Sequence, residues 1–497
     1  MSMAARILVL LLSPALAVVL GLAVRRARFS EYLNLAASVA VLLVALPLPF
    51  VAARPTTFLD GYLLVDPLGA WVVMCVAVVY LLSSIYAIGY MRHDASRKAR
   101  LPLFYALLAG FALTMLVAPL VNSIGVYWIA IELTTLVSTF LVGFERNAES
   151  MEAAWKYIIV VSSGISLALL GTTLLYWGGT FVYGETYQLT WASLVHAAPQ
   201  MPPVLLKMGF LLTLIGYGTK VGLAPMHTWL PDAHSEGPAP VSAMLSGALL
   251  NTAMVGIVRF LAATDAAGQG ALPHAALVIL GVCSLLVGAL FIVRQRQIKR
   301  LMAYSSVEHM GVLALGFGFG GTLGVAGALY HMINHSLAKP LLFFGAGNAM
   351  HRYGSKRIDD MRGVWRMFPV SGTLWLCGAV AITGAPPFGL FLSEFAILRA
   401  GWGGPYLWAA IAMLVLLIVI FVAFLNHFRA MYLAEYPADP GEPPVRAVPM
   451  ERDSWYAGWR VLPMALPLVP LLLLGVWWPA SWTALFHTIA NALGAHP

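Results

Sequence analysis

The sequence has few charged residues. Only 10% of its 497 residues are Asp, Glu, Lys or Arg, whereas soluble domains carry about 25%, and this scarcity excludes an ordinary soluble fold. Apolar stretches of about 20 residues recur instead, each long enough to cross a hydrocarbon core of about 30 Å as a helix. We therefore predict an all-α membrane protein with about fourteen transmembrane helices. They are expected at 6–24, 32–52, 68–90, 102–119, 122–143, 156–178, 205–225, 241–262, 272–293, 301–319, 322–347, 369–398, 405–428 and 461–480.

The chain is also poor in cysteine. Cys75, Cys283 and Cys377 lie singly inside predicted spans and show no CxxC spacing. This pattern argues against a disulfide framework, a zinc site or an iron–sulfur cluster. The sequence also lacks a nucleotide-binding glycine motif and a hydrolytic triad. We therefore predict no cofactor, no metal and no catalytic centre in this chain.

Lys and Arg are unevenly distributed among the predicted loops. The net charge of +8 would suit nucleic-acid binding, so the positions of these residues have to decide between a nucleic-acid partner and a membrane topology signal. They concentrate in odd-numbered loops: Arg25, Arg26, Arg28, Arg92, Arg97, Lys98, Arg100, Arg294, Arg296, Lys299, Arg300, Arg352, Lys356, Arg357, Arg362 and Arg366. The positive-inside rule then places these loops in the cytoplasm and both termini on the outer side of a bacterial inner membrane. Topology accounts for the charge without a nucleic acid.

Two predicted helices contain prolines that should interrupt them inside the membrane. The seventh carries GYGTKVGLAPMHTWLPDAHSEGPAP after its apolar run, and the twelfth carries AITGAPPFGLFLSEF. Such pairs are typical of inverted-repeat transporters, because unwound backbone is tolerated in a membrane only where protein or a wet cavity surrounds it. We therefore predict two inverted five-helix repeats with broken seventh and twelfth helices. The predicted units are N-terminal helices (1–101), the first repeat (102–262), the second repeat (263–432), and a cytoplasmic linker with a C-terminal helix (433–497).

Several ionisable residues lie inside the predicted spans. A charge at the centre of a bilayer costs at least about 2.5–3.5 kcal/mol, so each requires a partner, a cavity or a function. Glu132 and Lys220 form either a structural ion pair or a switch. Burial disfavours both charges and a neighbouring opposite charge favours them, so movement of one partner can load or unload Lys220. We favour the switch, which is an element of a proton pump.

Three ionisable residues recur at intervals of four in the predicted eleventh span. His331, His335 and Lys339 should therefore lie on one helix face, about 6 Å apart along the axis. This spacing suits proton hopping through intervening waters, and histidine titrates near neutral pH. Histidines at i and i+4 also suit zinc, but a protonated lysine cannot supply the third ligand that zinc requires. We favour the proton pathway.

Three more residues are candidates for the same pathway. Glu394 follows the proline break of the twelfth span, has no nearby cation in the sequence before Arg399, and is interpreted as a terminal proton site. Glu308 belongs either to the pathway or to an ion pair with Lys299 and Arg300 at the helix end. Lys156 lies near a span end and either anchors the helix at the interface or reaches inward.

Several long segments resemble the antiporter-like membrane subunits of respiratory complex I and of Mrp-type sodium/proton antiporters. They are SIYAIGYMRHD, EAAWKYII, GTKVGLAPMHTWLPDAHSEGPAPVSAMLS, IKRLMAYSSVEHMG and NHSLAKPLLFFGAGN. The resemblance covers nearly the whole chain and is strongest over 122–396. Within the family it is closest to the component F type of hydrogenase-4, of the formate hydrogenlyase class.

The resemblance implies a horizontal axis of charged residues at mid-membrane and a lateral helix near the C terminus. Glu132, Lys220, His331, His335, Lys339 and Glu394 match pathway positions of the family. The sequence departs from the family at Asn251, where several relatives carry Lys or His, so water is expected to bridge this step. The implied function is proton translocation in a redox-driven complex with hydrogenase or complex I-like partner subunits. The alternatives are an Mrp-like cation/proton antiporter subunit and a scaffold that no longer pumps.

Overall fold

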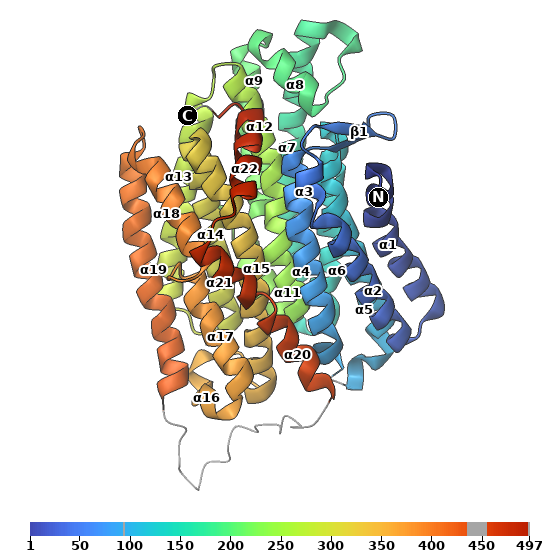
Figure 1. Ribbon diagram of the computed structural model, residues 1–497, viewed down its shortest axis with the longest axis vertical. Helices are drawn as coiled ribbons and strands as arrows, with labels where there is room; N and C mark the ends of the chain where they lie inside the picture. The colour runs from blue at the N-terminus through green and yellow to red at the C-terminus, as the bar shows by residue number, and fades with distance from the viewer. Residues whose placement is uncertain (93–94, 435–454, 496–497) are drawn as a thin grey trace.

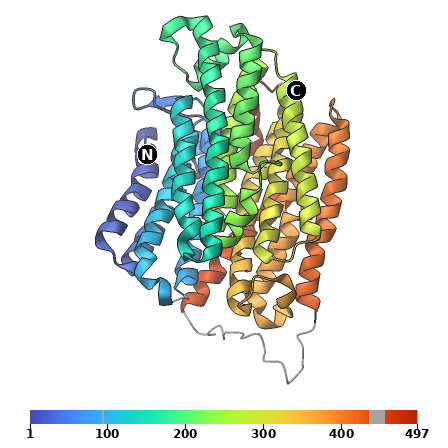
Figure 2. The same ribbon diagram turned by 180° about the vertical axis from the view of Figure 1, so that it is seen from behind.

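The computed structural model describes residues 1–92, 95–434 and 455–495, and these residues are mainly helical (Figure 1). The helices stand roughly side by side as one upright bundle, which the view from behind also shows (Figure 2). A short hairpin of β1 (Thr56–Phe58) and β2 (Leu63–Val65) caps the upper end. Residues 435–454 of the predicted linker lie outside the described residues.

Every predicted span is found as helix. Eleven helical segments of the described residues are long and apolar enough to cross a membrane. The helices that correspond to predicted spans are α1 (Met3–Val24), α2 (Ala27–Ala45), α3 (Leu48–Val51), α4 (Pro67–Met91), α5 (Leu101–Val117), α6 (Ile124–Val142), α7 (Ala148–Tyr183), α9 (Pro203–Val221), α11 (Ala239–Met244), η6 (Leu245–Leu249), α12 (Leu250–Ala266), α13 (Ala271–Val293), α14 (Ile298–Phe319), α15 (Gly321–Tyr353), α17 (Pro369–Ile382), α18 (Gly389–Trp402), α19 (Leu407–Leu433), α20 (Trp455–Ala465) and α21 (Leu468–Val476).

The helices α14 and α15 are not among those eleven segments. Their sequences carry glutamate, lysine and histidine, and nearly all of their side chains are buried by surrounding helices. Burial among protein explains how segments of this polarity are accommodated, because polar groups in the bilayer core are tolerated where they face the bundle interior. These two helices form the centre on which the site is built.

Both predicted helix breaks are present. The helix α9 ends at Val221 and the short helix α10 (Trp229–Glu236) begins eight residues later, after Gly222 at a φ of 82°. A positive φ is accessible to glycine because it has no Cβ. The helix α17 ends at Ile382 and α18 resumes at Gly389, with Pro386 and Pro387 between them. Proline lacks the backbone N–H that helix continuation requires.

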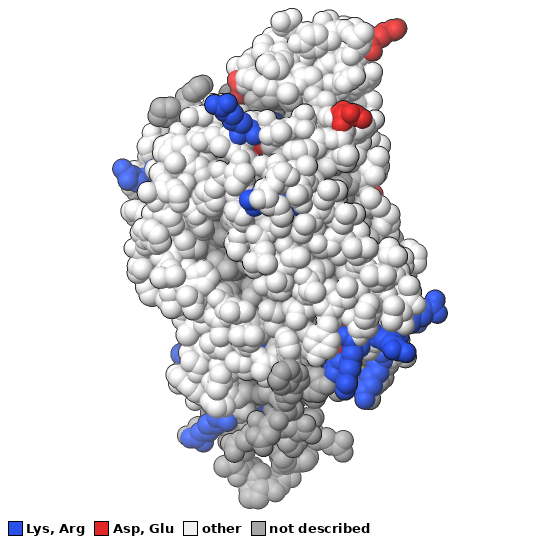
Figure 3. All heavy atoms as spheres, turned by 45° about the vertical axis from the view of Figure 1, so that its right-hand side comes forward, with Lys and Arg blue, Asp and Glu red and all other residues white. Residues whose placement is uncertain are grey.

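The basic loops gather at one end of the bundle. The densest group of Lys and Arg in Figure 3 lies at its lower end, and both chain termini lie toward the upper end in Figure 1. Two of the basic loops touch, since the amide of Ile298 donates to the carbonyl of Lys356 at 3.0 Å. The acidic residues of α10 neutralise them: Glu236 pairs with Lys356 at 2.7 Å, and Asp232 pairs with Arg300. The broken α9–α10 segment therefore reaches the basic end.

The predicted single C-terminal helix at 461–480 is wrong in its extent. The structure has α20, α21 and α22 (Ala480–Ala492) in succession, and α20 and α21 cross the face of the bundle obliquely (Figure 1). Pro467 and Pro479 stand at the starts of α21 and α22 and account for the divisions. Contacts such as Arg460 Nε to the carbonyl of Gly89, at 2.9 Å, fasten this segment to α4.

Candidate functional site

A row of ionisable side chains runs through the interior of the bundle. Its members come from α9, α10, α14, α15 and α18, and all but one are at most 2% exposed: Lys220, His234, Glu308, His309, His331, His335 and Lys339, with Glu394 at 8%. Burial of so many titratable groups is costly unless they are paired or functional. Their contacts therefore decide between a structural and a functional explanation.

Lys220 is held by hydroxyl groups. Its Nζ donates to Thr135 Oγ1 and to the Tyr157 hydroxyl, each at 2.8 Å. The Tyr157 hydroxyl also lies 2.8 Å from Ser138 Oγ, so a short chain of hydroxyls extends from the ammonium along α6. Hydroxyls donate and accept hydrogen bonds without holding a charge. Lys220 is thus solvated by the protein and free of a fixed counter-ion.

Glu132 lies on the same helix as Thr135, but it makes no contact within 4.0 Å with Lys220. Its Oε1 accepts from Ser162 Oγ at 2.5 Å, while its Oε2 is buried without a hydrogen-bond partner among the described residues. The two charges still interact electrostatically. The ion pair envisaged from the sequence is therefore a separated pair, because Thr135 and Tyr157 occupy the hydrogen-bonding positions around the lysine.

His331, His335 and Lys339 occupy one buried face of α15, as their spacing predicts. All three are 0% exposed. Lys339 Nζ donates to Ser305 Oγ at 2.9 Å and to the carbonyl of Met302 at 3.1 Å, both on α14. Neither ring nitrogen of His335 has a hydrogen-bond partner among the described residues. Like Lys220, Lys339 is bound by neutral oxygen atoms.

Glu308 and His309 extend the row from α14. His309 Nδ1 lies 3.1 Å from His331 Nε2, and His309 Nε2 lies 3.4 Å from Glu308 Oε2. His309 is thus interposed between a carboxylate and a second imidazole. This is the geometry in which an imidazole can take up a proton at one nitrogen and release one at the other. Glu308 is packed this closely because Gly288 of α13 faces it without a side chain.

The helix-end ion pair considered for Glu308 is absent from the described residues. Lys299 Nζ donates to the carbonyl of Ser235 at 3.0 Å and to that of Gly237, and Arg300 pairs with Asp232. Both cations are therefore turned toward the α10 region. Glu308 belongs to the buried row by position, although it lies only about three turns from the start of α14.

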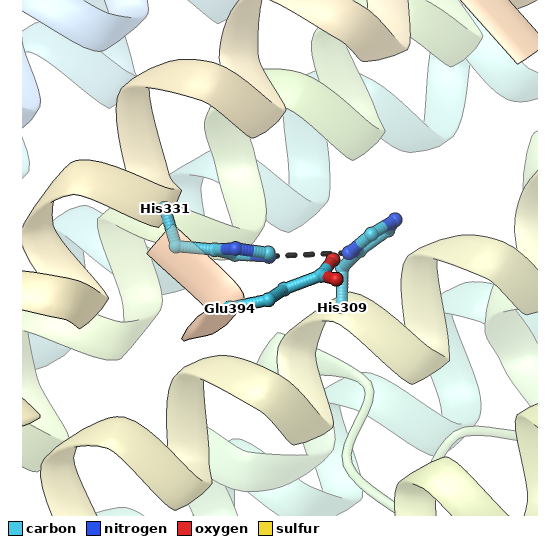
Figure 4. A group of neighbouring side chains, drawn as sticks. All are labelled: His309, His331 and Glu394. Carbon is cyan, nitrogen blue, oxygen red and sulfur yellow. Dashed lines mark hydrogen bonds between the residues drawn. The ribbon is translucent and has the colours of Figure 1, made fainter. Parts of the chain in front are cut away.

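Glu394 approaches the row from the broken helix α18. Figure 4 shows its carboxylate beside the rings of His309 and His331, which come from α14 and α15. One donor atom from each of the three residues lies within 4.8 Å of the others. Oε1 of Glu394 is buried without a partner among the described residues. Because Glu394 follows the break between α17 and α18, its carboxylate reaches the two histidines. This position is consistent with the predicted terminal proton site.

Asn251 lies against α15, the helix that carries His331, His335 and Lys339. It is fully buried on α12, and its Nδ2 donates to Ser336 Oγ at 3.0 Å, on the helix that carries His335 and Lys339. Its Oδ1 has no hydrogen-bond partner among the described residues. The preceding turn, η6, is a π-helix, a local form that is frequent at functional sites. Asn251 therefore faces a polar neighbour and not lipid.

Comparison with protein families identifies the family of the chain. A model described as "NADH:quinone oxidoreductase/Mrp antiporter, TM" matches residues 122–420, which include every member of the row. A second, described as "NADH-Ubiquinone oxidoreductase (complex I), chain 5 N-terminus", matches residues 59–99. The chain belongs to the antiporter-like family of membrane subunits.

Individual members of this antiporter-like family agree with the assignment. A Hydrogenase-4 component F homolog of Methylacidiphilum infernorum is 36% identical over 409 residues, which are 81% of this chain and 85% of that protein. Among solved structures, a chain of the archaeal membrane-bound sulfane sulfur reductase superposes with a TM-score of 0.84 at 21% identity, covering 99% of this chain and 97% of its own. A chain of the Mrp complex from Dietzia sp. DQ12-45-1b superposes at 0.81 and 20% identity, covering 98% and 97%. These two structures support the fold.

One candidate residue lies away from the row of this antiporter-like subunit. Lys156 is half exposed and pairs with Glu152 at 2.5 Å and with Asp232 at 3.3 Å. Asp232 also holds Arg300. The three-way contact joins α7 to α10 and α14 near the basic end. Lys156 therefore acts as a helix anchor in this arrangement and does not reach the buried histidines.

Two members of the row were missed by the sequence reasoning. His234 of α10 is fully buried, and neither of its ring nitrogens has a hydrogen-bond partner among the described residues. It lies in the proline-rich break after Lys220, where a polar residue can also be a simple loop residue. His309 follows Glu308 directly in the sequence. Its signal was weak, because adjacent residues on a helix point in different directions. His309 also lies on another helix than His331, so helical spacing could not connect the two.

Proposed function

We propose that this chain is the proton-translocating subunit of a redox-driven membrane complex, and that protons move from Glu132 along the buried row to Glu394. The observation that carries the proposal is the chemistry around the two lysines. Lys220 and Lys339 are completely buried, yet their ammonium groups are bound by hydroxyl and carbonyl oxygens and not by carboxylates.

This arrangement favours proton exchange over a purely structural role. A structural ion pair holds its partners in contact and keeps both charged, because separation would leave a buried charge uncompensated. Hydroxyl groups stabilise an ammonium through oxygen lone pairs, and they remain satisfied by other bonds when the lysine becomes neutral. The separated Glu132 then controls how readily Lys220 holds its proton, since an opposite charge stabilises the charged form.

We also propose the two inverted five-helix repeats, 102–262 and 263–432. Each unit has a carboxylate in its second helix, Glu132 or Glu308, followed by a long third helix. The third helices are α7 with 36 residues and α15 with 33. Each fourth helix is interrupted, and the interrupted segments carry Lys220 and Glu394. The two units therefore carry ionisable residues at equivalent positions, which supports two half-pathways of the same design joined in one chain.

Partner subunits supply the redox chemistry in this proposal. The component F homolog and the complex I family model place redox-driven assemblies among the relatives, so we propose partners of the hydrogenase-4, formate hydrogenlyase or complex I-like type and no cofactor in this chain. We further propose the bacterial inner membrane as the location. The basic end then faces the cytoplasm, and both termini face the outer side.

The proposal is tested by isolating the complex through an affinity tag on this chain and reconstituting it in sealed vesicles. We expect redox subunits to co-purify, and we expect addition of their electron donor to acidify or alkalinise the vesicle interior in a manner that a protonophore abolishes. Electron transfer without any proton movement would contradict the proposal, as would purification of this chain without redox subunits.

A second candidate is an Mrp-like cation/proton antiporter subunit. The similarity of its fold to a chain of the Mrp complex favours this alternative. It predicts that a sodium gradient alone, without an electron donor, drives proton movement in the same vesicles. A sodium-driven signal that persists when electron transfer is inhibited would favour the antiporter over the redox-driven pump.

A further inference from the structure

Three metal-ligating side chains converge in the interior from three different helices. His309 comes from α14, His331 from α15 and Glu394 from α18, and one donor atom of each lies within 4.8 Å of the others (Figure 4). The sequence suggested zinc only for His331 with His335, and that pair lacked a third ligand. Tertiary packing supplies a different set, two imidazoles and one carboxylate, which is a recognised ligand set for zinc.

Hydrogen bonds orient His331 toward this point. Ser393 Oγ donates to the carbonyl of Leu390 at 2.7 Å, so its lone pairs face His331 Nδ1 at 2.9 Å. Nδ1 of His331 must then carry the proton of the neutral ring and donate it to Ser393. Nε2 is left with a free lone pair, directed at His309. The ring is thus fixed in the tautomer that a metal ion requires.

His309 has the matching arrangement. A metal ion at its Nδ1 requires the ring proton on Nε2, and Glu308 Oε2 lies 3.4 Å from that atom. Histidine ligands of zinc commonly donate their second N–H to a carboxylate, which raises the basicity of the ligand and fixes its orientation. His331 therefore has an outer hydrogen-bond partner in Ser393, and Glu308 stands within ion-pair distance of the outer nitrogen of His309, where it can accept this proton once a metal ion is bound.

The distances are close to those a metal ion needs. Two ligands bound to one tetrahedral zinc at about 2.1 Å stand about 3.4 Å apart, and His309 Nδ1 and His331 Nε2 are 3.1 Å apart. The donor atom of Glu394 lies within 4.8 Å of both nitrogens, whereas two zinc bonds of about 2.1 Å span at most about 4.2 Å, so a small movement of the carboxylate completes the site. Its Oε1 has no hydrogen bond to lose among the described residues.

We propose that His309, His331 and Glu394 form a binding site for a divalent transition-metal ion of the zinc type, and that occupancy of this site blocks proton translocation. Imidazole nitrogen favours zinc over magnesium or calcium, which prefer oxygen ligands. Binding shifts the ring proton of neutral His309 from Nδ1 to Nε2 and places one lone pair of each ring on the metal. The blocking part of the inference rests on the proposed function, whereas the binding part rests on the geometry alone.

Glu394 is the most exposed of the three ligands. It is 8% exposed, whereas both histidines are 0% exposed. The carboxylate stands against Gly384 in the break between α17 and α18, where a side chain in place of glycine would collide with it. An ion arriving through this break meets the carboxylate first and the histidines behind it. Slow, time-dependent inhibition is expected from a site reached in this way.

Direct metal binding is the primary test. The purified full-length chain in detergent is dialysed against Zn²⁺, and bound zinc is measured per chain by elemental analysis; Co²⁺ is used in parallel for its visible absorption bands. We expect one tight site with the spectrum of tetrahedral Co²⁺ bound by nitrogen and oxygen. Glu394→Gln and His331→Ala should each weaken binding at least about tenfold, and Ser393→Ala should weaken it about tenfold, because outer partners contribute on that scale.

The control is His234→Ala, which removes another fully buried histidine outside the cluster and should leave zinc affinity unchanged. If a ligand variant aggregates, zinc binding is measured instead on Ser393→Ala, a variant that retains all three ligands. Equal zinc binding by the native chain and by the Glu394→Gln, His331→Ala double variant would overturn the site, since the ion would then be bound only at the surface. Absence of any tight site would overturn it as well.

Inhibition is measured separately in vesicles that contain the intact complex. Zn²⁺ at the concentration that fills the site should abolish proton movement while electron transfer falls less, and a chelator should restore it. If zinc binds the isolated chain but leaves proton movement unchanged, the blocking role is wrong. If the chain has no tight zinc site but Lys220→Ala still abolishes proton movement, the metal site is wrong and the proposed function is supported.

Discussion

Lys220 Nζ lies 2.8 Å from the Tyr157 hydroxyl and 2.8 Å from Thr135 Oγ1, and it is not in contact with the carboxylate of Glu132. The tyrosine ring also stands under the ammonium, with its centroid 5.0 Å from Nζ. An ammonium in this setting is stabilised by neutral groups and by the electron-rich ring face. Lys220 can therefore lose its proton without leaving a charged carboxylate in contact with a neutral amine.

Lys220→Ala is expected to abolish proton translocation while the complex still assembles. The substitution removes the proton carrier, but Thr135, Tyr157 and Ser138 can satisfy one another through their own hydroxyls. Glu132→Ala should also abolish translocation, because it removes the charge that favours the protonated lysine. The measurement is donor-driven acidification in vesicles, together with the amount of assembled complex in the membrane.

Lys156→Ala is the matched control for these variants. Lys156 is half exposed and belongs to a contact near the basic end, so its loss should cost at most about 1 kcal/mol of stability and leave pumping intact. Undiminished pumping by Lys220→Ala would remove the lysine from the pathway. Disappearance of the whole complex in that variant, but not in Lys156→Ala, would favour a structural role for the lysine.

Asn251→Leu is expected to stop translocation without unfolding the helix pair. Leucine removes the amide from the step between Lys220 and the α15 histidines and excludes the bridging water that an unprotonatable residue needs there. Ser336 keeps its bond to the carbonyl of Gly247 at 2.6 Å, so no new unsatisfied hydroxyl arises on α15. Asn251→Lys and Asn251→His should be tolerated, since both restore an ionisable group. Normal pumping in Asn251→Leu would place the pathway elsewhere.

Glu308→Gln is expected to abolish most proton movement. Glutamine retains the size of the side chain beside His309, but it cannot exchange a proton near neutral pH. Glu152→Gln makes the same chemical change at a carboxylate that is 65% exposed, and it should leave pumping unaffected. If both variants pump equally well, Glu308 is a structural residue of the interior. Thermal unfolding of the two complexes tests whether any loss comes from instability.

Proton movement is expected to be independent of sodium. A bound Na⁺ needs several oxygen ligands, whereas the carboxylates of the row stand beside nitrogen groups, such as Glu308 beside His309 and Glu394 beside His331. Replacement of Na⁺ by choline at constant ionic strength and pH should leave the donor-driven signal unchanged. A rate that rises with Na⁺ concentration, or uptake of labelled Na⁺, would show that sodium is the coupled ion.

The sequence by itself determined where the membrane helices of the bundle lie and where the seventh and twelfth predicted spans are broken, although it missed the division of the C-terminal segment into α20, α21 and α22. Apolar length fixes a membrane helix locally, because the hydrocarbon core admits backbone only with its hydrogen bonds satisfied inside the segment. The breaks before Trp229 and before Gly389 follow from proline chemistry that acts on neighbouring residues alone. The common face of His331, His335 and Lys339 follows equally from helical periodicity.

Only the tertiary structure decided which helices meet. Apolar helix faces resemble one another and resemble lipid, so hydrophobicity does not specify helix partners in a membrane. For this reason the sequence left Glu308 undecided between His309 and the Lys299–Arg300 end, and it placed Glu132 directly against Lys220. Packing turned Lys299 and Arg300 away toward α10 and inserted Thr135 and Tyr157 around Lys220. It also brought Glu394 to His309 and His331, a juxtaposition of three helices that no local pattern encodes.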